Sequence, residues 1–445
     1  MDTNALFTQA LGFVNPWRVT QLTFDAVGKR LDIRADFAPG STFACPVCGA
    51  ECGVYDSTQQ KWRHLNFFEN LTFIEARQPR TRCAKDGVKT VVVPWARAGS
   101  DFTLLFEAMM VELARNGMTP TAIGRIVGEH DTRIWRVLEH YVDEARARAT
   151  FAGVEKVGVD ETSRAKGHVY VTLFADLAGA RVMFVTEGKD HETVSRFKED
   201  FAAHGGDPLQ VTDFSLDMSA AFIKGIGQEF ENANLTFDKF HVIKLMNEAL
   251  DKVRRGEQKS EPGLKKTRYV WLKNEENLKP GERAMFDALK DSTLSTARAY
   301  RIKTTLQGLY DQSPATAADF FRRWYFWATH SRLPPVVRLA KTLKQHQAGI
   351  LRWFDSQINN GLLEGINSLV QAAKARARGF RSPRKMAVVI YLLLSKLDFQ
   401  LPNALPSAIH VDLTALCTAQ TKSCVKFEVV QRPLNHPGKR DGVWV

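Results

Sequence analysis

The sequence contains no apolar run of about 20 residues, the length that a membrane-spanning helix needs, so we expect no transmembrane helix. The first residues, MDTNALFTQALGF, contain an acid at position 2 and no basic segment, so they differ from a secretory signal. Cysteine is scarce: there are 6 in 445 residues, and four of them lie between Cys45 and Cys83. In a chain without a secretory signal, this cluster indicates a metal site rather than a disulfide framework.

Acidic residues are in the minority. The chain has 61 lysines and arginines against 49 aspartates and glutamates, which gives a net charge of +12. That excess favours a polyanionic partner, nucleic acid before an anionic membrane, although a basic soluble enzyme could show the same balance. The other proportions, 44% hydrophobic and 25% charged, are those of a soluble globular protein. A chain of 445 residues is long for one core, so we expect about two to four domains.

The N-terminal segment, residues 1–95, shows short alternating patterns that predict β-strands, including a hairpin around Gly28. In CPVCG the two thiolates have the spacing that lets both bind one zinc ion, and RCAKDG supplies a second half of such a site. The candidate Zn²⁺ ligands are Cys45, Cys48, Cys83 and Asp86, with Cys52 or His64 as alternatives for the fourth position. Asp86 stands where a four-cysteine ribbon has Cys or His. The alternative is a β module that has lost its metal and keeps buried free thiols.

Residues 101–150 change to a helical pattern after a predicted linker, PWARAGSD, at 94–101. One helix ends at Gly117, and the next starts after Thr119, which can cap it. A short turn leads to a third helix that we expect Asp131 to cap. Two short helices joined in this way predict a helix-turn-helix, whose last helix enters the major groove of DNA. The candidate DNA contacts at the start of that helix are Thr132, Arg133 and Arg136.

Residues 151–254 alternate between strands and helices. Three adjacent strands, a helix and two strand–helix units follow one another, which is the order of an RNase H-like α/β domain. In that fold an acid on the first strand, here Asp160, lies beside an acid at the end of the fourth, here Asp217. Lys239 and His241, in DKFHV at the end of the next strand, could contact a scissile phosphate, with capping or packing as the alternative role.

Residues 255–345 are helical and charged, and we interpret them as an all-helical insertion with its own small core. The aromatic run FFRRWYFW belongs to that core in this interpretation, and base stacking is the alternative. Residues 346–402 then return to the catalytic domain through a predicted helix at 354–378. One face of this helix presents Glu364, Asn367, Gln371, Lys374 and Arg378, and the other Ile366, Leu369, Val370, Ala373 and Ala377. Such a polar face indicates a site, although a solvated face is the simpler alternative. Candidate phosphate contacts here are Lys374, Arg378 and Arg381.

Three acids form one candidate metal site: Asp160, Asp217 and Glu364. Carboxylates that are brought together repel one another, and a divalent cation removes that cost. Mg²⁺ (or Mn²⁺) prefers oxygen ligands, and two such ions about 3.5–4 Å apart can activate a water or 3′-hydroxyl and stabilise the leaving oxygen of a phosphodiester. We expect Asp217 to bridge both ions. For a single acid at the end of a strand, a capping role is the simpler alternative.

Several motifs together resemble the DDE transposases of bacterial insertion sequences, the ISL3 family, from about residue 40 to 400: CPVCG, RIWRVLEHYV, VGVDE, LDMS, DKFHV and NNGLLEGINSLVQAAKARARGF. The resemblance maps the family's catalytic acids onto Asp160, Asp217 and Glu364. It implies an N-terminal zinc module, a helical insertion before the last acid, and cleavage and strand transfer at terminal inverted repeats. Asp86 departs from the family's pattern, and the tail beyond residue 404 is longer than expected, as a changed reading frame would make it.

The sequence therefore predicts a multidomain α+β protein with a zinc-ribbon-like β module, a helix-turn-helix domain and an RNase H-like catalytic domain that carries an all-helical insertion. The predicted segments are 1–95, 101–150, 151–254, 255–345, 346–402 and an irregular tail at 403–445. We expect a cytoplasmic, nucleoid-associated enzyme with DNA as its partner and no membrane partner. Pairing two element ends would need a homo-oligomer. The alternatives are a non-catalytic DNA-binding regulator, a decayed transposase copy, or a host nuclease of the same fold.

Overall fold

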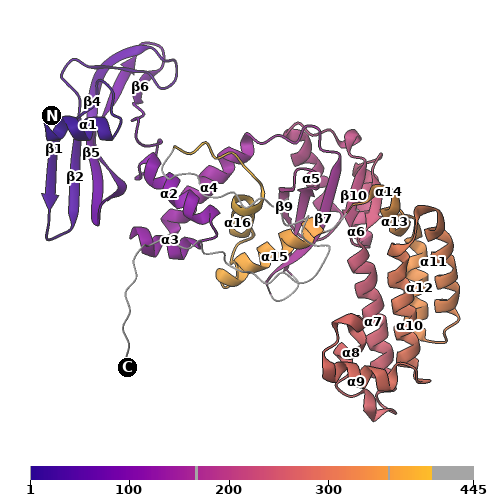
Figure 1. The fold of residues 1–445 in the computed structure, drawn as a ribbon. Coiled ribbons are helices and arrows are strands. Elements are labelled where there is room, and N and C mark those ends of the chain that lie inside the picture. The colour runs from indigo at the N-terminus through magenta and orange to yellow at the C-terminus, as the bar shows by residue number, and fades with distance from the viewer. Residues whose placement is uncertain (1, 166–168, 359–360, 403–445) are drawn as a thin grey trace, which may run out of the picture. The chain divides into compact units, whose positions relative to one another are not determined.

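The computed structural model describes residues 2–165, 169–358 and 361–402 (Figure 1). The tail expected at 403–445 lies outside the described residues. Within the described ranges, no helix combines the length and the apolar character that crossing a bilayer would require.

The N-terminal region is a β-sheet preceded by a short helix. Its elements are α1 (Thr3–Ala10), β1 (Arg18–Asp25), β2 (Arg30–Asp36), β3 (Thr42–Ala44), β4 (Glu51–Phe67), β5 (Asn70–Cys83) and β6 (Gly87–Thr90). The strands pair in the order β1-β2-β5-β4-β3, and β6 pairs with β5. The predicted hairpin around Gly28 is confirmed as β1–β2. β4 and β5 form a long hairpin, and the two metal-site motifs lie at its open end.

The segment at 94–101 is packed, so its interpretation as a linker is wrong. Trp95 is buried and lies edge-on to Trp17, with ring centroids 4.9 Å apart. Ser100 is buried as well, and its Oγ donates a 2.6 Å hydrogen bond to the carboxylate of Glu107. Burial of a large ring and of a paired carboxylate fixes this segment between the sheet and the helices that follow.

Three helices follow the N-terminal sheet: α2 (Leu104–Arg115), α3 (Pro120–Val127) and α4 (Asp131–Ala147). As predicted, Gly117 lies just beyond α2 with a φ of 83°, which favours glycine, and Thr119 caps α3 by accepting from a backbone N–H. The expected cap of α4 is wrong. His130 is the N-cap, with its Nδ1 accepting from the Thr132 N–H, and Asp131 is the first helical residue.

The central domain is built on a second sheet. Its elements are β7 (Lys156–Ala165), β8 (Val169–Asp176), β9 (Arg181–Glu187), α5 (Glu192–Ala203), β10 (Asp213–Leu216), α6 (Ala220–Glu229) and β11 (Asn234–Phe237). The strand order is β11-β10-β7-β8-β9, in which β10 runs parallel to both of its neighbours and the other pairs are antiparallel. The predicted succession of three strands, a helix and two strand–helix units is confirmed. The first strand, β7, lies at the centre of the sheet beside the fourth, β10.

The two faces of β7 have different partners. Val157 and Val159 pack into the hydrophobic core that includes Phe197 of α5. Gly158, between them, faces helix α15 (Gly361–Arg376), where an added Cβ would lie 2.9 Å from the δ-carbons of Leu363. Glycine at this position therefore allows α15 to approach the strand closely.

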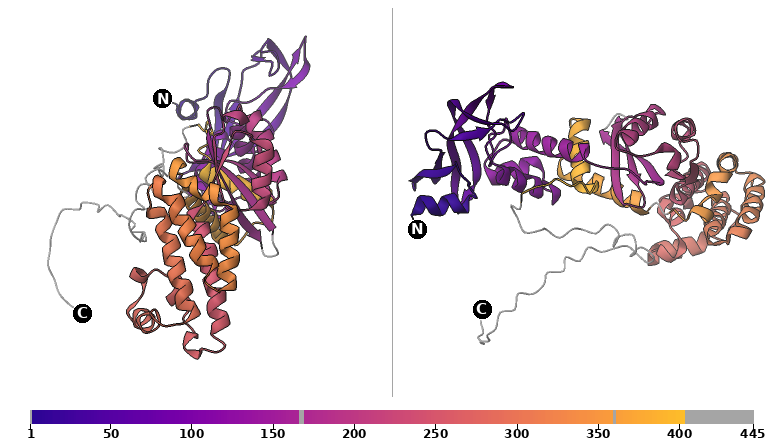
Figure 2. Two further views of the ribbon diagram at one scale, coloured as in Figure 1. Left: turned by 90° about the vertical axis from the view of Figure 1, so that its right-hand side faces the viewer. Right: turned by 90° about the horizontal axis from the view of Figure 1, so that it is seen from above.

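A helical insertion follows the central sheet. It consists of α7 (Lys239–Glu257), α8 (Arg268–Leu272), α9 (Pro280–Leu289), α10 (Ser295–Gln307), α11 (Pro314–Thr329) and α12 (Pro334–Gln345). Helices α10 and α12 pack along α7, and α11 packs on α10 and α12 (Figures 1 and 2). The predicted start at residue 255 falls inside α7, so one continuous helix leads from the sheet into the insertion.

The prediction of a separate core for the insertion is wrong. Trp271 and Trp324 of the insertion belong to the same hydrophobic cluster as Phe214 of β10. The aromatic run is also only partly core, because Phe326 and Trp327 are 65% and 37% exposed. The insertion is therefore an extension of the core of the central domain, with one aromatic face open to solvent.

The chain returns to the central domain through short helices. These are α13 (Gln347–Leu351), α14 (Trp353–Ser356) and α15, followed by α16 (Pro383–Leu394). The single helix predicted at 354–378 is wrong, because Gln357 takes a φ of 49° and ends α14 at Ser356, and α15 begins separately at Gly361. Leu369, which was expected in the core, is 39% exposed, whereas Val370 is buried. Arg378 lies beyond the end of α15.

Candidate active site, metal centre and DNA-binding helices

Three carboxylates lie level with one another on adjacent strands: Asp160 within β7, Asp217 directly after β10 and Asp238 directly after β11. The parallel register of β7 and β10 pairs Gly158 with Ser215. Continued by two residues, this register sets Asp217 level with Asp160. The register between β10 and β11 in turn sets Asp238 beside Asp217. The two registers therefore place Asp160, which lies within β7, beside Asp217 and Asp238 at the edge formed by the carboxyl ends of β10 and β11.

Helix α15, which carries Glu364, docks on the same strand through a matched set of contacts. On one face of β7 lie Gly158, Asp160 and Thr162, and against them lie Leu363, Asn367 and Gln371 of α15. Asn367 Nδ2 donates to Asp160 Oδ2, and Gln371 Nε2 donates to Thr162 Oγ1 at 2.6 Å. An advance of two residues along β7 covers about 6.6 Å, and an advance of four residues along α15 covers about 6.0 Å. Each contact residue of the strand therefore lies opposite the corresponding residue of the helix. This register positions Glu364, one residue after Leu363.

The negative charge of the carboxylates at the site is not fully balanced by nearby cationic side chains. Burial is the main cause that raises the pKa of Asp160 to about 6, and the charges of Asp217 and Asp238 add to the rise. Burial, followed by the charge of Asp238, also raises the pKa of Glu364. Carboxylates in this state are stabilised in their ionised form by a bound cation.

Asp238 is a site residue that the sequence analysis missed. It follows β11 directly, caps α7 by accepting from the Phe240 N–H, and accepts a 2.8 Å hydrogen bond from His241 Nδ1. That hydrogen bond is the main reason why the pKa of His241 is raised. Lys239 and His241 lie in the first turn of α7 and not at the end of a strand, which corrects their predicted placement. The signal for Asp238 was in the sequence, because it follows its strand as directly as Asp217 follows β10.

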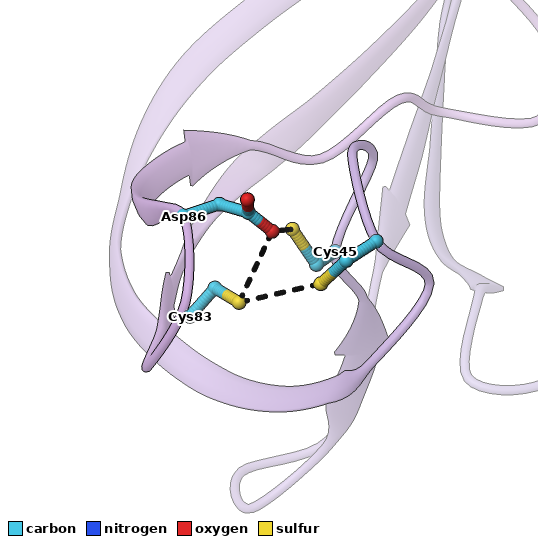
Figure 3. A group of neighbouring side chains, drawn as sticks. Cys45, Cys83 and Asp86 are labelled. Carbon is cyan, nitrogen blue, oxygen red and sulfur yellow. Dashed lines mark hydrogen bonds between the residues drawn. The ribbon is translucent and has the colours of Figure 1, made fainter.

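A compact metal-ligating group lies in the N-terminal sheet. Its members are Cys45, Cys48, Cys83 and Asp86, and their ligand atoms all lie within 4.8 Å of one another. Among the described residues, this is the group that meets that criterion. Cys45 and Cys48 lie in the β3–β4 turn, Cys83 is the last residue of β5, and Asp86 lies in the β5–β6 turn. Figure 3 shows the Asp86 carboxylate directed toward Cys45 and Cys83. Asp160, Asp217 and Glu364 do not form so close a group.

The geometry of the N-terminal group fits zinc. Asp86 Oδ2 lies 3.3 Å from Cys45 Sγ and 3.4 Å from Cys83 Sγ, and the sulfurs of Cys48 and Cys83 are 3.5 Å apart. Tetrahedral zinc would separate sulfur from oxygen by about 3.5 Å and two sulfurs by about 3.8 Å. Backbone N–H groups of Asp86 and Lys85 lower the pKa of Cys83, which favours the thiolate that binds metal.

The alternative fourth ligands have other partners. The Cys52 thiol is buried and donates to the Ala50 carbonyl at 3.3 Å. His64 Nδ1 lies 2.9 Å from Thr103 Oγ1, and burial lowers the pKa of His64 to about 4. The geometry therefore favours Asp86 as the fourth ligand over both.

The predicted DNA contacts at the start of α4 are not equivalent. Thr132 and Arg136 are exposed. Arg133 is held by ion pairs with Glu129 and Asp101, and its guanidinium lies 4.2 Å from the centre of the Phe102 ring. Arg136 is therefore the cation of this set that is open to solvent, whereas Arg133 fastens the helix to the segment before α2.

The basic residues near α15 also differ. Lys374 Nζ donates to the Ser163 carbonyl at 2.5 Å, so it helps to dock α15 on β7. Arg378 and Arg381 are exposed, and the backbone of Arg381 accepts from Arg164. Lys239 is half-buried, with its ammonium 5.5 Å from the Trp353 ring. Arg378 and Arg381 remain open to a polyanion.

Comparisons with known proteins assign the family. The ISL3 family model described as "Transposase" matches residues 157–390, "Helix-turn-helix domain of transposase family ISL3" matches 91–142, and "zinc-finger of transposase IS204/IS1001/IS1096/IS1165" matches 41–86. The chain is 27% identical over 388 residues to the transposase for insertion sequence element IS1557 of Mycobacterium tuberculosis, covering 79% of this chain and 85% of that protein. It is also 27% identical over 354 residues to the transposase for IS1001 of Bordetella parapertussis, covering 76% and 85%. The chain belongs to the ISL3 family of transposases, enzymes that bind and cleave DNA.

Proposed function

We propose that the central domain is RNase H-like and that Asp160, Asp217 and Glu364 bind Mg²⁺ or Mn²⁺ to cleave DNA at terminal inverted repeats and transfer the freed strand. The observation that carries this proposal is the pair of registers that meet at β7. One sets Asp217 level with Asp160, and the other docks α15, with Glu364, on the same strand. The strand order β11-β10-β7-β8-β9 supports the RNase H-like assignment.

The residues of the site have distinct proposed roles. Divalent ions bound by the three acids would activate the attacking water or 3′-hydroxyl and stabilise the leaving oxygen. Asp217, in the middle of the edge, is placed to bridge two ions. Asn367 holds one oxygen of Asp160 and so orients that carboxylate. His241, whose pKa is raised by its hydrogen bond to Asp238, is placed to contact the scissile phosphate.

The other modules would hold the DNA. We propose that Arg136 meets the major groove, that Thr132 and Arg133 support it, and that Arg378 and Arg381 contact phosphates with Lys374 and Lys239 nearby. Zn²⁺ held by Cys45, Cys48, Cys83 and Asp86 would fix the β4–β5 hairpin. Two element ends would be paired by a homo-oligomer, and the protein would act at the nucleoid in the cytoplasm.

The test is cleavage of a labelled inverted-repeat end in the presence of Mg²⁺ or Mn²⁺. We expect nicks at the element end that are lost in Asp217→Ala and Glu364→Ala, while both variants still bind the end. Arg136→Ala should instead weaken end binding while leaving residual cleavage dependent on metal. Binding without any metal-dependent cleavage by the wild-type protein would instead support a non-catalytic regulator.

A further inference from the structure

One face of helix α11 exposes aromatic rings that the core does not use. Arg323, Phe326, Trp327 and His330 are all exposed and stand at i, i+3, i+4 and i+7, so they lie on one side of the helix. Buried residues such as Phe321 and Trp324 occupy the opposite side, which packs on α10 and α12. We call the four exposed residues the α11 stripe.

The rings and the cation of the α11 stripe are arranged for stacking. The rings of Phe326 and His330 are parallel to within 30°, with centroids 4.1 Å apart. Arg322, the neighbour of Arg323, pairs with Asp319 at 3.1 Å, whereas Arg323 itself meets no carboxylate in the described part of the chain. A flat aromatic surface beside a free guanidinium can hold a nucleobase and its phosphate together.

The charge of the surrounding hairpin indicates the partner. Residues 314–345, which form α11 and α12, contain six lysines and arginines against one acid, Asp319. Residues 268–289, which form α8 and α9 in the same insertion, contain four of each sign. The positive excess is therefore a local property of the α11–α12 hairpin and favours a polyanion over a second copy of this basic chain.

We propose that the α11 stripe binds DNA with unpaired bases, stacking them on Phe326 and Trp327 while Arg323 contacts the backbone. The proposal rests on the transposase function, since cleavage at an element end is what would supply single-stranded DNA. A purely double-stranded partner would need the cations but not the rings, because the bases of a duplex are already stacked on one another.

The experiment compares full-length protein binding to a blunt duplex and to the same duplex with a single-stranded 3′ extension, without divalent ions. We expect Phe326→Ala and Trp327→Ala each to weaken binding of the extended DNA by about tenfold and binding of the blunt duplex by less than about twofold. Arg323→Ala should weaken both and lower the salt dependence of log K by about one unit of slope.

The matched control is Tyr269→Ala in α8. Tyr269 is 62% exposed beside Arg268, but it lies in the part of the insertion where the charges are balanced. We expect no change for either DNA. The proposal would be overturned if Phe326→Ala and Trp327→Ala weakened binding of both DNAs equally, or weakened binding of neither. A shift in self-association by sedimentation without a DNA effect would assign the stripe to a second copy instead. A wild-type protein that binds neither DNA would contradict the transposase function itself.

Discussion

Asp160 is a partly buried carboxylate whose negative charge is poorly compensated by its neighbours. Its oxygens accept from the Glu161 N–H and from Asn367, and no lysine or arginine in the described ranges pairs with it. By contrast, Asp213, the first residue of β10 and four residues before Asp217, is buried but bonded to Arg352 at 3.1 Å. The difference separates a carboxylate that is suited to bind a cation from one that stabilises the fold.

The first prediction concerns stability without divalent ions. The pKa of Asp160 in the folded protein, about 6, lies above its ordinary value of 3.8, so the folded state binds this proton more tightly than the unfolded state. Ionisation therefore destabilises the fold increasingly from about pH 4 to 6, by at most about 3 kcal/mol. Asp160→Asn should raise the free energy of unfolding at pH 8 and leave it unchanged near pH 4, as measured by urea titration.

The control for this prediction is Asp213→Asn, which removes one partner of a buried ion pair. It should lower the free energy of unfolding at pH 8. If Asp160→Asn also lowered the free energy of unfolding at pH 8, the prediction would fail, because ionisation of the Asp160 carboxylate would then not destabilise the fold.

The second prediction concerns Asn367 as a positioning residue. Its Nδ2 holds Asp160, and its Oδ1 is buried without a hydrogen-bond partner among the described residues. Asn367→Leu keeps the size of the side chain but frees the Asp160 carboxylate to rotate, so the Mn²⁺ concentration for half-maximal cleavage should rise by about tenfold. End binding should stay unchanged.

The neighbouring bond supplies a matched control for Asn367. Gln371→Leu breaks the contact with Thr162 in the same helix–strand interface but does not touch Asp160. Its Mn²⁺ midpoint should stay within about twofold of wild type. Equal shifts in both variants would mean that Asn367 only docks the helix. Recovery in Asn367→His, which restores a ring N–H donor, would support the positioning role.

At the scale of elements, the sequence predicted the parts whose side-chain pattern is local. The signals for the strand that carries Asp160, for the glycine stop after α2 and for the Thr119 cap all act within a few residues, and each was predicted. The break after Gln357 was not predicted, although the Asn-Asn-Gly that follows Ile358 contains weak helix formers and a turn dipeptide, because the helical pattern was extended across that signal. Trp95 was assigned to a linker because its partners, Trp17 and Trp62, are distant in sequence.

For the candidate site, too, local sequence signals were predicted and contacts between distant segments were not. The spacing of the cysteines pointed to a metal group, and the choice of Asp86 over Cys52 required the fold of the β4–β5 hairpin. The polar face of α15 was visible from the sequence, but its partner, the Gly158 side of β7, was not. Asp238 was missed because an acid after a strand usually caps the next helix, which Asp238 also does.

The third prediction concerns zinc in the N-terminal sheet. The purified protein should contain about one zinc ion per chain. Cys83→Ser should lose it, since Cys83 contacts both Cys48 and Asp86. Cys52→Ser should keep it, because Cys52 is a buried thiol outside the ligand group. Metal analysis by mass spectrometry checks both variants, and zinc loss in Cys52→Ser alone would reverse the assignment.

At the scale of the whole molecule, cations on separate elements could serve one substrate. Arg136 lies on α4, Arg378 and Arg381 follow α15, and Arg323 lies on α11. Each is exposed, while nearby cations such as Arg133 and Lys374 are used inside the protein. Part of the net charge of +12 is thus presented to solvent at several separate positions, each of which is available to a polyanion.

The fourth prediction concerns cooperation between protomers when two ends are joined to one target. If each end is cleaved by its own protomer, a two-ended insertion needs two active subunits. In an equal mixture of wild type and Asp217→Ala, two-ended products should fall to roughly one quarter and the total number of joined ends to about one half. Gel analysis of labelled ends inserted into a plasmid measures both. Because Asp217→Ala is expected to bind ends normally, the variant competes for ends without changing the chemistry of its wild-type neighbour. If two-ended products fell only to one half as well, a single protomer would act on both ends, and the proposed homo-oligomer would be contradicted.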